Sequence, residues 1–286
     1  MQTEFSNAER AEVLVQALPN IRKYVGTTVV VKYGGNAMIN EELKQQVMED
    51  IALLSLIGVR IVLVHGGGPE ISDVMDKLGK EPRFIDGLRV TDEETAEIAQ
   101  MVLSGKVNKS LVNLLLKKGG NAIGISGVDA RFIEAEMKDE ILGYVGRITH
   151  INIDPILGLF ARGYIPVVAT IGCDREGHVY NINGDTAAAY IAGALGAERL
   201  IMMTDVAGIL RDKDDPKTLI SHVTLEEAKT LFAQGVIAGG MIPKVECCIE
   251  AISRGVKNVV IMDGRVPHSI LMELLTDEGA GTMIGE

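Results

Sequence analysis

A lysine and two glycines stand where chemistry on phosphate groups would need them. Lys32 ends a β-branched run and is followed, after one residue, by Gly34 and Gly35. A lysine that leaves a buried strand in this way places its ammonium group at the carboxyl edge of a sheet, where open α/β sheets bind ligands. The glycines let backbone N–H groups approach phosphate oxygens closely. By itself, the pattern also fits a tight turn with a surface lysine.

A second glycine cluster follows another short apolar run. His65, Gly66, Gly67, Gly68 and Pro69 stand in order, just before a helical pattern. Glycines and a proline at a helix start form a cradle for anions at the positive end of the helix. The segment is not a dinucleotide fingerprint, and the G-x-x-x-x-G-K-[ST] motif is absent from the sequence. It therefore indicates a different kind of phosphate or carboxylate site.

Two more helices begin with charged residues. Asp185 follows Asn181 and Asn183, and a first-turn acid is stabilised by the helix dipole. Lys244 follows two glycines and a proline, where its charge opposes the dipole, and this indicates that an anion occupies the site. Together these segments predict phosphoryl transfer, which depends on positioning and charge neutralisation. A carboxylate acceptor is already ionised at pH 7 and needs no general base.

The elements that must position these residues alternate along the chain. Short β-branched runs bounded by glycine predict buried strands at 27–32, 59–64, 122–125, 165–170, 200–203 and 258–262. Apolar residues at helical spacing predict helices at 41–57, 69–78, 96–116, 185–195, 225–232 and 244–254. We therefore expect an α/β fold, a three-layer αβα sandwich in two lobes with a central, mostly parallel sheet.

Three kinds of segment depart from this alternation. Polar-alternating stretches at 131–137, 143–150 and 177–182 predict hairpins on an edge or lid. The charged run 212–217 predicts a solvated loop. An appended N-terminal helix at 7–24, interrupted at Pro19, carries an apolar stripe. Because this helix precedes the first strand, it either caps the sheet or packs against another subunit.

The composition of the chain limits the classes of partner and the location that we expect. The 286 residues carry a formal charge of −11, and an acidic surface argues against nucleic acid as a partner. Cys173, Cys247 and Cys248 lack metal-ligand spacing, so no metal site is predicted and the latter two read as buried thiols. The N-terminus lacks a signal-peptide pattern, and no apolar run is long enough to cross a bilayer. We therefore expect a cytoplasmic location.

Six segments in fixed order resemble the amino-acid kinase family, from about residue 27 to the C-terminus. They are Lys-Tyr-Gly-Gly, His-Gly-Gly-Gly, Asp-Gly-Leu-Arg-Val-Thr, Asn-Ile-Asn-Gly-Asp, Thr-Asp-Val-Ala-Gly-Ile-Leu and Gly-Gly-Met-Ile-Pro-Lys. The resemblance is to the branch that phosphorylates N-acetyl-L-glutamate in arginine synthesis, with ATP and Mg²⁺. It implies an oligomerisation helix at 1–26 and a kinase domain at 27–286. Within that domain it implies a substrate and phosphate lobe at about 27–180 and a nucleotide lobe at about 181–286.

The resemblance also implies roles for particular residues. Lys32 and Lys244 would flank the migrating phosphoryl group, and Asp185 would orient them. Arg89 would pair with a substrate carboxylate in bidentate fashion. N-acetylglutamate would be held by Gly67, Gly68, Arg89 and Asn181; the phosphates and the nucleotide would be held by Gly34, Gly35, Gly67, Asp205, Gly208, Leu210, Val236 and Ala238.

Arginine-inhibited members of the branch resemble this chain in their N-terminal helix, which links dimers into a hexamer. The corresponding effector residues here would be Tyr24, His268, Glu278 and Gly281. The sequence leaves open whether a nitrogen-signalling protein binds. Two other functions remain: a sister kinase acting on glutamate, aspartate, carbamate or uridylate, and an arginine or nucleotide sensor without catalysis. Intact Lys32, Asp185 and Lys244 argue against the sensor.

Overall fold

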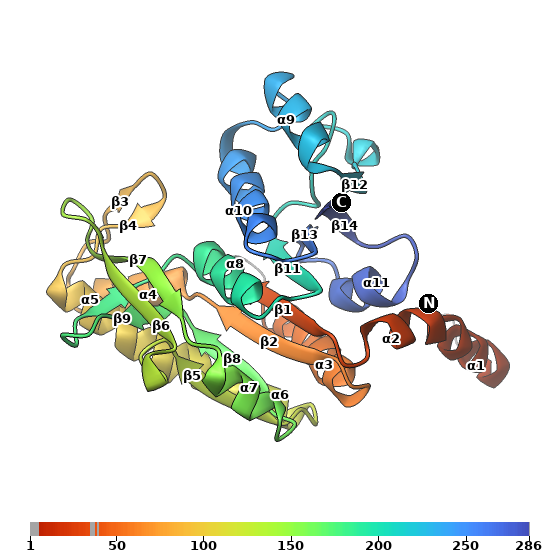
Figure 1. Ribbon diagram of the computed structural model, residues 1–286, viewed down its shortest axis with the longest axis horizontal. Coiled ribbons are helices and arrows are strands. Elements are labelled where there is room, and N and C mark those ends of the chain that lie inside the picture. Colours follow the sequence, from red (N-terminus) through yellow and green to blue (C-terminus); the bar gives the residue numbers. More distant parts are fainter. Residues whose placement is uncertain (1–5, 35–37, 39, 286) are drawn as a thin grey trace.

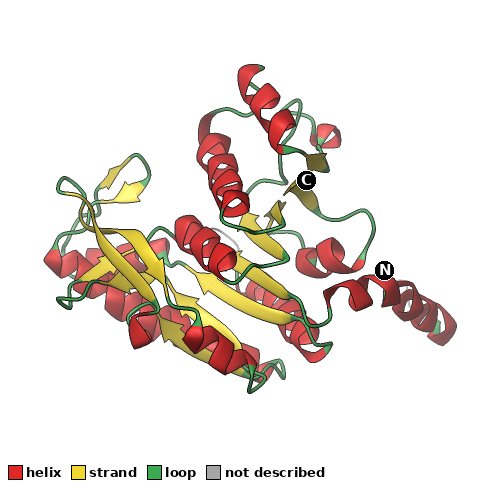
Figure 2. Ribbon diagram, viewed as in Figure 1, coloured by secondary structure: helices red, strands yellow, loops and turns green. Residues whose placement is uncertain are grey.

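One large sheet runs through the middle of the protein, whose computed structural model describes residues 6–34, 38 and 40–285 (Figures 1 and 2). Within this described part the sheet has eight strands. In spatial order they are β12 (His222–Val223), β14 (Gly281–Gly285), β13 (Asn258–Asp263), β11 (Arg199–Thr204), β1 (Thr28–Tyr33), β2 (Arg60–His65), β8 (Ile165–Ala169) and β5 (Ala122–Ser126). The six predicted strands are all present, and they lie next to one another.

The sheet is mostly parallel, as predicted. The six strands from β13 to β5 run in one direction. The glycine-rich segments that follow β1 and β2 therefore begin at the same edge of the sheet, where the strands have their carboxyl ends. The pairing of β13 with β14 is antiparallel. β14 was not predicted, because Gly281–Gly285 is short and rich in glycine, and strand propensity comes largely from side-chain packing.

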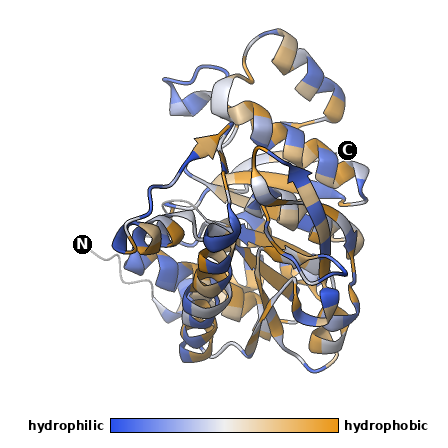
Figure 3. Ribbon diagram, turned by 90° about the vertical axis from the view of Figure 1, so that its left-hand side faces the viewer, coloured by the Kyte–Doolittle hydropathy of each residue, from blue (hydrophilic) through white to orange (hydrophobic). Residues whose placement is uncertain are grey.

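Helices cover both faces of the sheet, which confirms the three-layer sandwich. Val29 and Val31 of β1 face one core, and Val30 between them faces the other, as the period of a strand requires. The first core is covered by α3 (Glu41–Leu56), α4 (Gly68–Lys77), α5 (Glu93–Gln100), α6 (Asn108–Lys117) and α11 (Ser269–Leu275). The second is covered by α7 (Asp154–Phe160), α8 (Gly184–Ala194), α9 (Leu225–Ala233) and α10 (Ile242–Ser253). Figure 3 shows the strands between the helices in mostly hydrophobic colours.

The predicted hairpins form a separate small barrel rather than an edge of the main sheet. Its strands are β6 (Ile133–Asp139), β7 (Gly143–Ile151), β9 (Ile171–Cys173) and β10 (Val179–Asn181). The barrel is closed because β9 pairs with both β6 and β10, while β7 pairs with β6 and β10 on the other side. A further two-residue hairpin, β3 (Phe84–Ile85) with β4 (Leu88–Arg89), projects beside it (Figure 1).

The prediction of one continuous helix at 96–116 is wrong in the middle of that range. The chain forms α5, then a π-helical segment η2 (Met101–Val107), and then α6. A π turn holds one more residue than an α turn, so it changes which side chains of α6 face the sheet. Apolar spacing did not reveal the shift, because both sides of the segment keep an apolar face.

The N-terminal helix is interrupted at Ala17 rather than at Pro19. It consists of α1 (Asn7–Gln16) and α2 (Leu18–Tyr24), and Pro19 lies in the first turn of α2, where a missing N–H costs nothing. α1 buries no residue and extends away from the body (Figure 1). In the part of the chain that the structure describes, no helix is both long and apolar enough to cross a bilayer.

Candidate active site

Lys32 and Asp185 meet at the carboxyl edge of the sheet. Nζ of Lys32, near the end of β1, lies 2.9 Å from Oδ1 of Asp185 in the first turn of α8. Asn183 caps this helix, because its side-chain oxygen accepts the N–H groups of Asp185 and Thr186 at 3.0 Å each. A Cβ at Gly34 would lie 3.0 Å from the ammonium nitrogen, so glycine leaves the space that the lysine occupies.

Lys244 faces the same place from α10, which packs on α8. With Asp185 it lines a cavity of about 560 Å³. Cys247 also lines this cavity, and burial raises the pKa of its thiol to about 12, with Asp185, Lys32 and Lys244 all close enough to act on it. The structure therefore brings the two predicted lysines to one site around one carboxylate. Cys247, expected to be merely buried, is part of this wall.

The second glycine segment lies at the start of α4, where Gly67 is the N-cap. A Cβ at Gly67 would lie 2.7 Å from Cδ2 of Leu103 and 3.1 Å from Cγ2 of Val107, so the backbone is pressed against η2. The first N–H groups of a helix lack partners inside it, and the helix dipole makes this end positive. The geometry suits an anion. Gly35, from the first glycine segment, lies outside the described residues.

Arg89 is a buried cation at the end of β4, with an exposed fraction of 7%. One guanidinium nitrogen donates to the carbonyl oxygen of Gly68 at 2.8 Å and to Oγ of Ser72 at 2.9 Å. The guanidinium stacks over the ring of Phe84, 4.8 Å from its centroid, and burial lowers the pKa of Arg89. Among the described residues it forms no ion pair, so a bound carboxylate would supply the missing negative charge.

Asn181 is connected to Arg89 through the side chain of Thr91. Its Nδ2 is 3.5 Å from Oγ1 of Thr91, and that hydroxyl donates to the carbonyl oxygen of Arg89 at 2.8 Å. Thr91 is fully buried and lies two residues after the end of the β3–β4 hairpin. Asp86, Gly87 and Leu88 of this hairpin line the Lys244 cavity together with Lys138. Lys138 was not predicted, because its sequence surroundings are those of an ordinary surface lysine.

A neighbouring cavity of about 540 Å³ collects most of the predicted nucleotide residues. It is lined by Val206, Gly208, Ile209, Leu210, Arg211, Asp212, Lys213, Gly235, Val236, Ala238 and Met241. Gly208 has a φ of 146°, and a Cβ there would lie 2.4 Å from Oγ1 of Thr282, so a side chain does not fit. Asp205 is not part of this wall; its carbonyl oxygen accepts a hydrogen bond from Arg265 at 2.7 Å.

Another cavity, of about 330 Å³, lies between α2 and the C-terminal segment. Its walls are formed by Asn20, Lys23, Tyr24, Arg199, Ser221, His222, Glu273, Leu274, Thr276, Asp277, Glu278, Gly281 and Met283. Three of the four predicted effector residues, Tyr24, Glu278 and Gly281, are therefore together. His268 is not on this wall, because its Nδ1 lies 2.6 Å from Oδ1 of Asp50. Arg199 and Glu273, which sequence patterns did not indicate, form a buried ion pair there.

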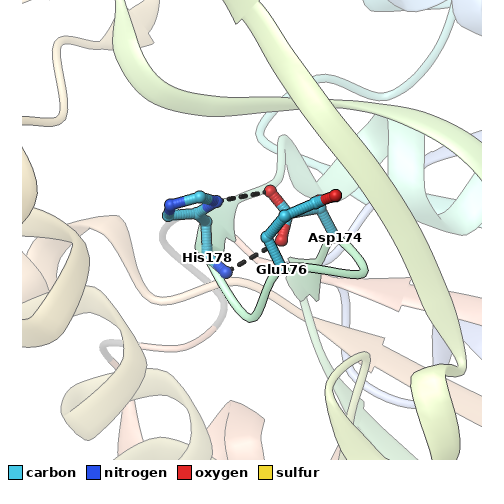
Figure 4. A group of neighbouring side chains, drawn as sticks. All are labelled: Asp174, Glu176 and His178. Atoms are coloured by element: carbon cyan, nitrogen blue, oxygen red, sulfur yellow. Dashed lines mark hydrogen bonds and ion pairs between the residues drawn. The ribbon is translucent and has the colours of Figure 1, made fainter.

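Asp174, Glu176 and His178 form the one group in the described residues with a metal-like arrangement (Figure 4). The carboxylate of Asp174 already accepts hydrogen bonds from two backbone N–H groups, from Nδ1 of His178 and from the hydroxyl of Tyr180. These bonds lower the pKa of Asp174 to about 2 although its partial burial opposes them. The cluster is therefore explained by the hydrogen bonds that hold the turn between β9 and β10 in place.

Two lysines around a carboxylate, beside glycine-rich helix starts, define a phosphotransferase of the amino acid kinase family. The chain belongs to that family, whose model matches residues 27–263. Among curated relatives, "Acetylglutamate kinase" of Brachyspira hyodysenteriae is 54% identical over 280 residues, which is 97% of each chain. "Acetylglutamate kinase" of Clostridioides difficile is 53% identical over 279 residues, covering 97% of this chain and 98% of that protein. The resemblance read from the six segments is confirmed.

Solved structures agree with the fold. N-acetylglutamate synthase from Neisseria gonorrhoeae, complexed with coenzyme A and N-acetyl-glutamate, matches with a TM-score of 0.84 at 28% identity, over 96% of this chain. This chain spans only 63% of that synthase. The same synthase complexed with coenzyme A and L-arginine matches with a TM-score of 0.80 at 26% identity. Carbamate kinase from Giardia, at 18% identity and a TM-score of 0.65, shares the fold.

Proposed function

We propose that this chain transfers the γ-phosphoryl group of MgATP to the side-chain carboxylate of N-acetyl-L-glutamate and so forms an acyl phosphate. The curated acetylglutamate kinases, more than half identical over nearly the whole chain, support this acceptor. The observation that carries the proposal is that Asp185 lines one cavity together with Lys244 and forms an ion pair with Lys32. Because a sensor would not need two lysines at a phosphate site, this cluster favours catalysis.

The acceptor binds through its charges. Arg89 has a buried guanidinium fork without an anionic partner among the described residues, and a fork pairs well with a planar carboxylate. Gly67, Gly68 and Asn181 complete this side of the site. One carboxylate of N-acetylglutamate pairs with Arg89, which leaves the other free to attack phosphorus.

The reaction needs charge neutralisation more than proton transfer. A carboxylate oxygen forms the new bond to the γ-phosphorus, the bond from phosphorus to the β,γ-bridging oxygen breaks, and ADP leaves with that electron pair. No proton moves, so no base is required. Lys32 and Lys244 stabilise the charge on the migrating group, and Asp185 holds Lys32 in place at 2.9 Å. Mg²⁺ arrives with ATP and is held chiefly by its phosphates.

The two ends of the reaction belong to different parts of the kinase domain. We assign the nucleotide to the cavity of about 540 Å³ with Gly208, Leu210, Val236 and Ala238. Arg211 and Lys213 on its wall suit the negative charge of ATP. This division corresponds to an acceptor lobe at about 27–180 and a nucleotide lobe at about 181–286, with residues 1–26 outside both.

A single assay tests the acceptor. The purified protein is incubated with MgATP and, separately, N-acetylglutamate, glutamate, aspartate, carbamate or UMP, and ADP release is followed in a coupled reaction. Hydroxylamine added to the mixture converts an acyl phosphate to a hydroxamate, which identifies the product. We expect turnover and hydroxamate with N-acetylglutamate, and at least tenfold lower kcat/KM with every other acceptor. Faster turnover with another acceptor would assign the chain to a sister kinase.

Arginine is the proposed inhibitor, and it binds the cavity of about 330 Å³. Glu278 and Asp277 offer carboxylates to a guanidinium, whereas Glu273 is already paired with Arg199. The arginine complex of the similar synthase supports this ligand. We expect arginine to inhibit the wild type and Glu278→Gln to raise the inhibitory concentration about tenfold, because a charged hydrogen bond is lost.

The N-terminal helix is the proposed contact between subunits, and a hexamer built from three dimers is the proposed assembly. α1 buries none of its residues within its own chain, and Val13, Leu14 and Val15 are 56%, 70% and 63% exposed. Apolar side chains at such exposure favour burial against another surface.

A further inference from the structure

A buried pair of polar side chains lies directly under the second glycine segment. His65 ends β2 and Asn108 begins α6, and both have an exposed fraction of 0%. Nδ2 of Asn108 lies 3.0 Å from Nε2 of His65 and 2.9 Å from the carbonyl oxygen of Val167. Since a carbonyl oxygen only accepts, one hydrogen of Asn108 goes to Val167, and the other goes to Nε2 of His65, with the carbonyl oxygen of Ile125 a more distant acceptor at 3.4 Å. Nε2 of His65 is therefore an acceptor without a proton.

The other ring nitrogen fixes the tautomer. Nδ1 of His65 lies 2.9 Å from the carbonyl oxygen of Gly66, so Nδ1 carries the proton and donates it. The ring is thus neutral, and each of its two nitrogen atoms forms a hydrogen bond. Burial lowers the pKa of His65 to about 4, and the nearby charge of Lys109 acts in the same direction. No titration of this ring takes place near neutral pH.

The ring in turn orients the glycine segment. In a trans peptide the C=O and N–H groups point in opposite directions, and the described residues contain no cis peptide bond. Because the carbonyl of Gly66 points toward the buried ring, the N–H of Gly67 points away from it. Gly67 is the N-cap of α4, at the positive end of that helix.

The placement of Asn108 depends on the π-helical segment before it. One residue of an α-helix corresponds to a rotation of about 100°, so the extra residue of a π turn decides which way Asn108 faces. The same segment presses Leu103 and Val107 against Gly67. From the other side, Nζ of Lys109 donates to Oδ1 of Asn108 at 3.0 Å and to the carbonyl oxygen of Gly124 at 2.9 Å.

We propose that Asn108 is a positioning residue for phosphoryl transfer, which acts through His65 to aim the N–H of Gly67 at the transferring group. The inference rests on the proposed function, because it assigns the anion at this loop to the reaction. It explains why a polar pair occupies the core between β2 and α6, where apolar side chains would otherwise pack. It also assigns the π-helical segment a role, which is to orient Asn108, and π turns often occur at functional sites.

The first test replaces the amide by a carboxylate of the same shape. Asn108→Asp removes both donors and places an acceptor oxygen opposite Nε2 of His65, which favours the neutral tautomer with its proton on Nε2; Nδ1 then has no hydrogen to donate, and its bond to the carbonyl oxygen of Gly66 is lost. We expect kcat to fall about tenfold or more, as for the loss of one transition-state donor, while the KM for MgATP changes less than about threefold. The tautomer is read from ring ¹⁵N shifts in histidine-labelled protein, with His65→Gln identifying the signal among five histidines.

A second variant moves Asn108 without touching the loop. A Cβ at Gly124 on β5 would lie 1.8 Å from Oδ1 of Asn108, so Gly124→Ala must displace that side chain. We expect the same loss of kcat and the same change of ring signals. The control is Leu115→Ala, which empties a fully buried position two turns further along α6. It lowers the melting temperature but leaves kcat within about threefold and the ring unchanged.

Three results overturn the proposal. One is a wild-type His65 ring that is protonated or carries its proton on Nε2, which is observed in wild type once His65→Gln has identified the signal. Another is a changed ring in either folded variant with normal kcat. The third is a loss of kcat in Leu115→Ala equal to that in Asn108→Asp, which would make the effect one of general packing. If wild type fails to phosphorylate N-acetylglutamate, the proposed function fails instead, and the ring signals still report whether Asn108 holds His65.

Discussion

Oδ1 of Asp50 lies 2.6 Å from Nδ1 of His268, although the two residues are 218 positions apart. Asp50 belongs to α3, and His268 stands in a left-handed conformation, with a φ of 54°, just before α11. Asp50 is only 1% exposed, and its Oδ2 has no hydrogen-bond partner among the described residues. Burial raises the pKa of Asp50 to about 6, although the bond to His268 opposes this.

This pair predicts a pH-dependent stability. A carboxyl group whose folded pKa is raised binds its proton more tightly in the folded state, so its stabilising contribution is complete below the unfolded pKa of about 4 and is lost as pH rises through 6. Asn at this position stays neutral. We expect Asp50→Asn to gain up to about 3 kcal/mol relative to wild type over the whole range, about half of it between pH 5 and 8.

The measurement is the free energy of unfolding in urea at several pH values. Asp76→Asn, an exposed change of the same kind on α4, is the matched control and should track wild type at every pH. A difference between Asp50→Asn and wild type that stays constant from pH 5 to 8 would show that Asp50 does not change its protonation there.

Lys244→Met tests the second ammonium group of the active site. The methionine keeps the length and apolar part of the side chain but loses its charge at the cavity that Asp185 also lines. We expect kcat to fall about 10²–10³-fold, because a donor to the transition state is removed. ATP affinity, measured by calorimetry, should change little, since most of the nucleotide lies in the neighbouring cavity. Lys117→Met, exposed at the end of α6, is the control; normal turnover in Lys244→Met would remove Lys244 from the chemistry.

Arg89→Lys separates charge from geometry in the acceptor site. Lysine retains the positive charge but cannot form two parallel bonds to a carboxylate or replace both bonds to Gly68 and Ser72. We expect the KM for N-acetylglutamate to rise about 10–100-fold, corresponding to one lost charge-assisted bond, with the KM for MgATP unchanged. Arg83→Lys, exposed before the same hairpin, should behave as wild type. Equal KM values for Arg89→Lys and wild type would exclude bidentate pairing.

The positions of six sheet strands and their mostly parallel direction followed from local patterns, but the order of the strands and the residue pairs that make the site did not. Lys32 and Asp185 were each recognisable, because a lysine after a strand and an acid at a helix start are local features. Their contact depends on β1 lying beside β11 and on α8 packing over β1, which are long-range relations. The resemblance to the amino-acid kinase family, rather than periodicity, joined them.

The features that were missed have no local pattern. The bond from His65 to Asn108 joins an apparent turn residue to a position inside a predicted continuous helix, and only the π segment turns Asn108 inward. His268 was predicted beside arginine, together with Glu278, because the C-terminal stretch resembles that of arginine-inhibited family members. In the structure α11 separates them, and His268 pairs with Asp50 instead.

Removing residues 1–16 tests the proposed subunit contact without damaging the effector cavity. The cut deletes α1, which buries nothing in its own chain, and retains α2, which packs on α11 and supplies the buried Tyr24 to the cavity. A cut at residue 24 would remove Tyr24 and so confuse assembly with arginine binding. We expect a smaller particle by light scattering and a weaker arginine response, while calorimetry still detects arginine binding because Glu278 and Gly281 remain.

A point change refines the same test. Leu14→Glu places a charge among the exposed apolar residues of α1, whereas Gln16→Glu adds the same charge about 200° away around the helix. If the apolar side chains bury against another subunit, the first change should shrink the particle and the second should not, because an unpaired buried carboxylate is costly and an exposed one is not. A full-size particle for both Leu14→Glu and the truncation would mean that α1 is not the contact between subunits.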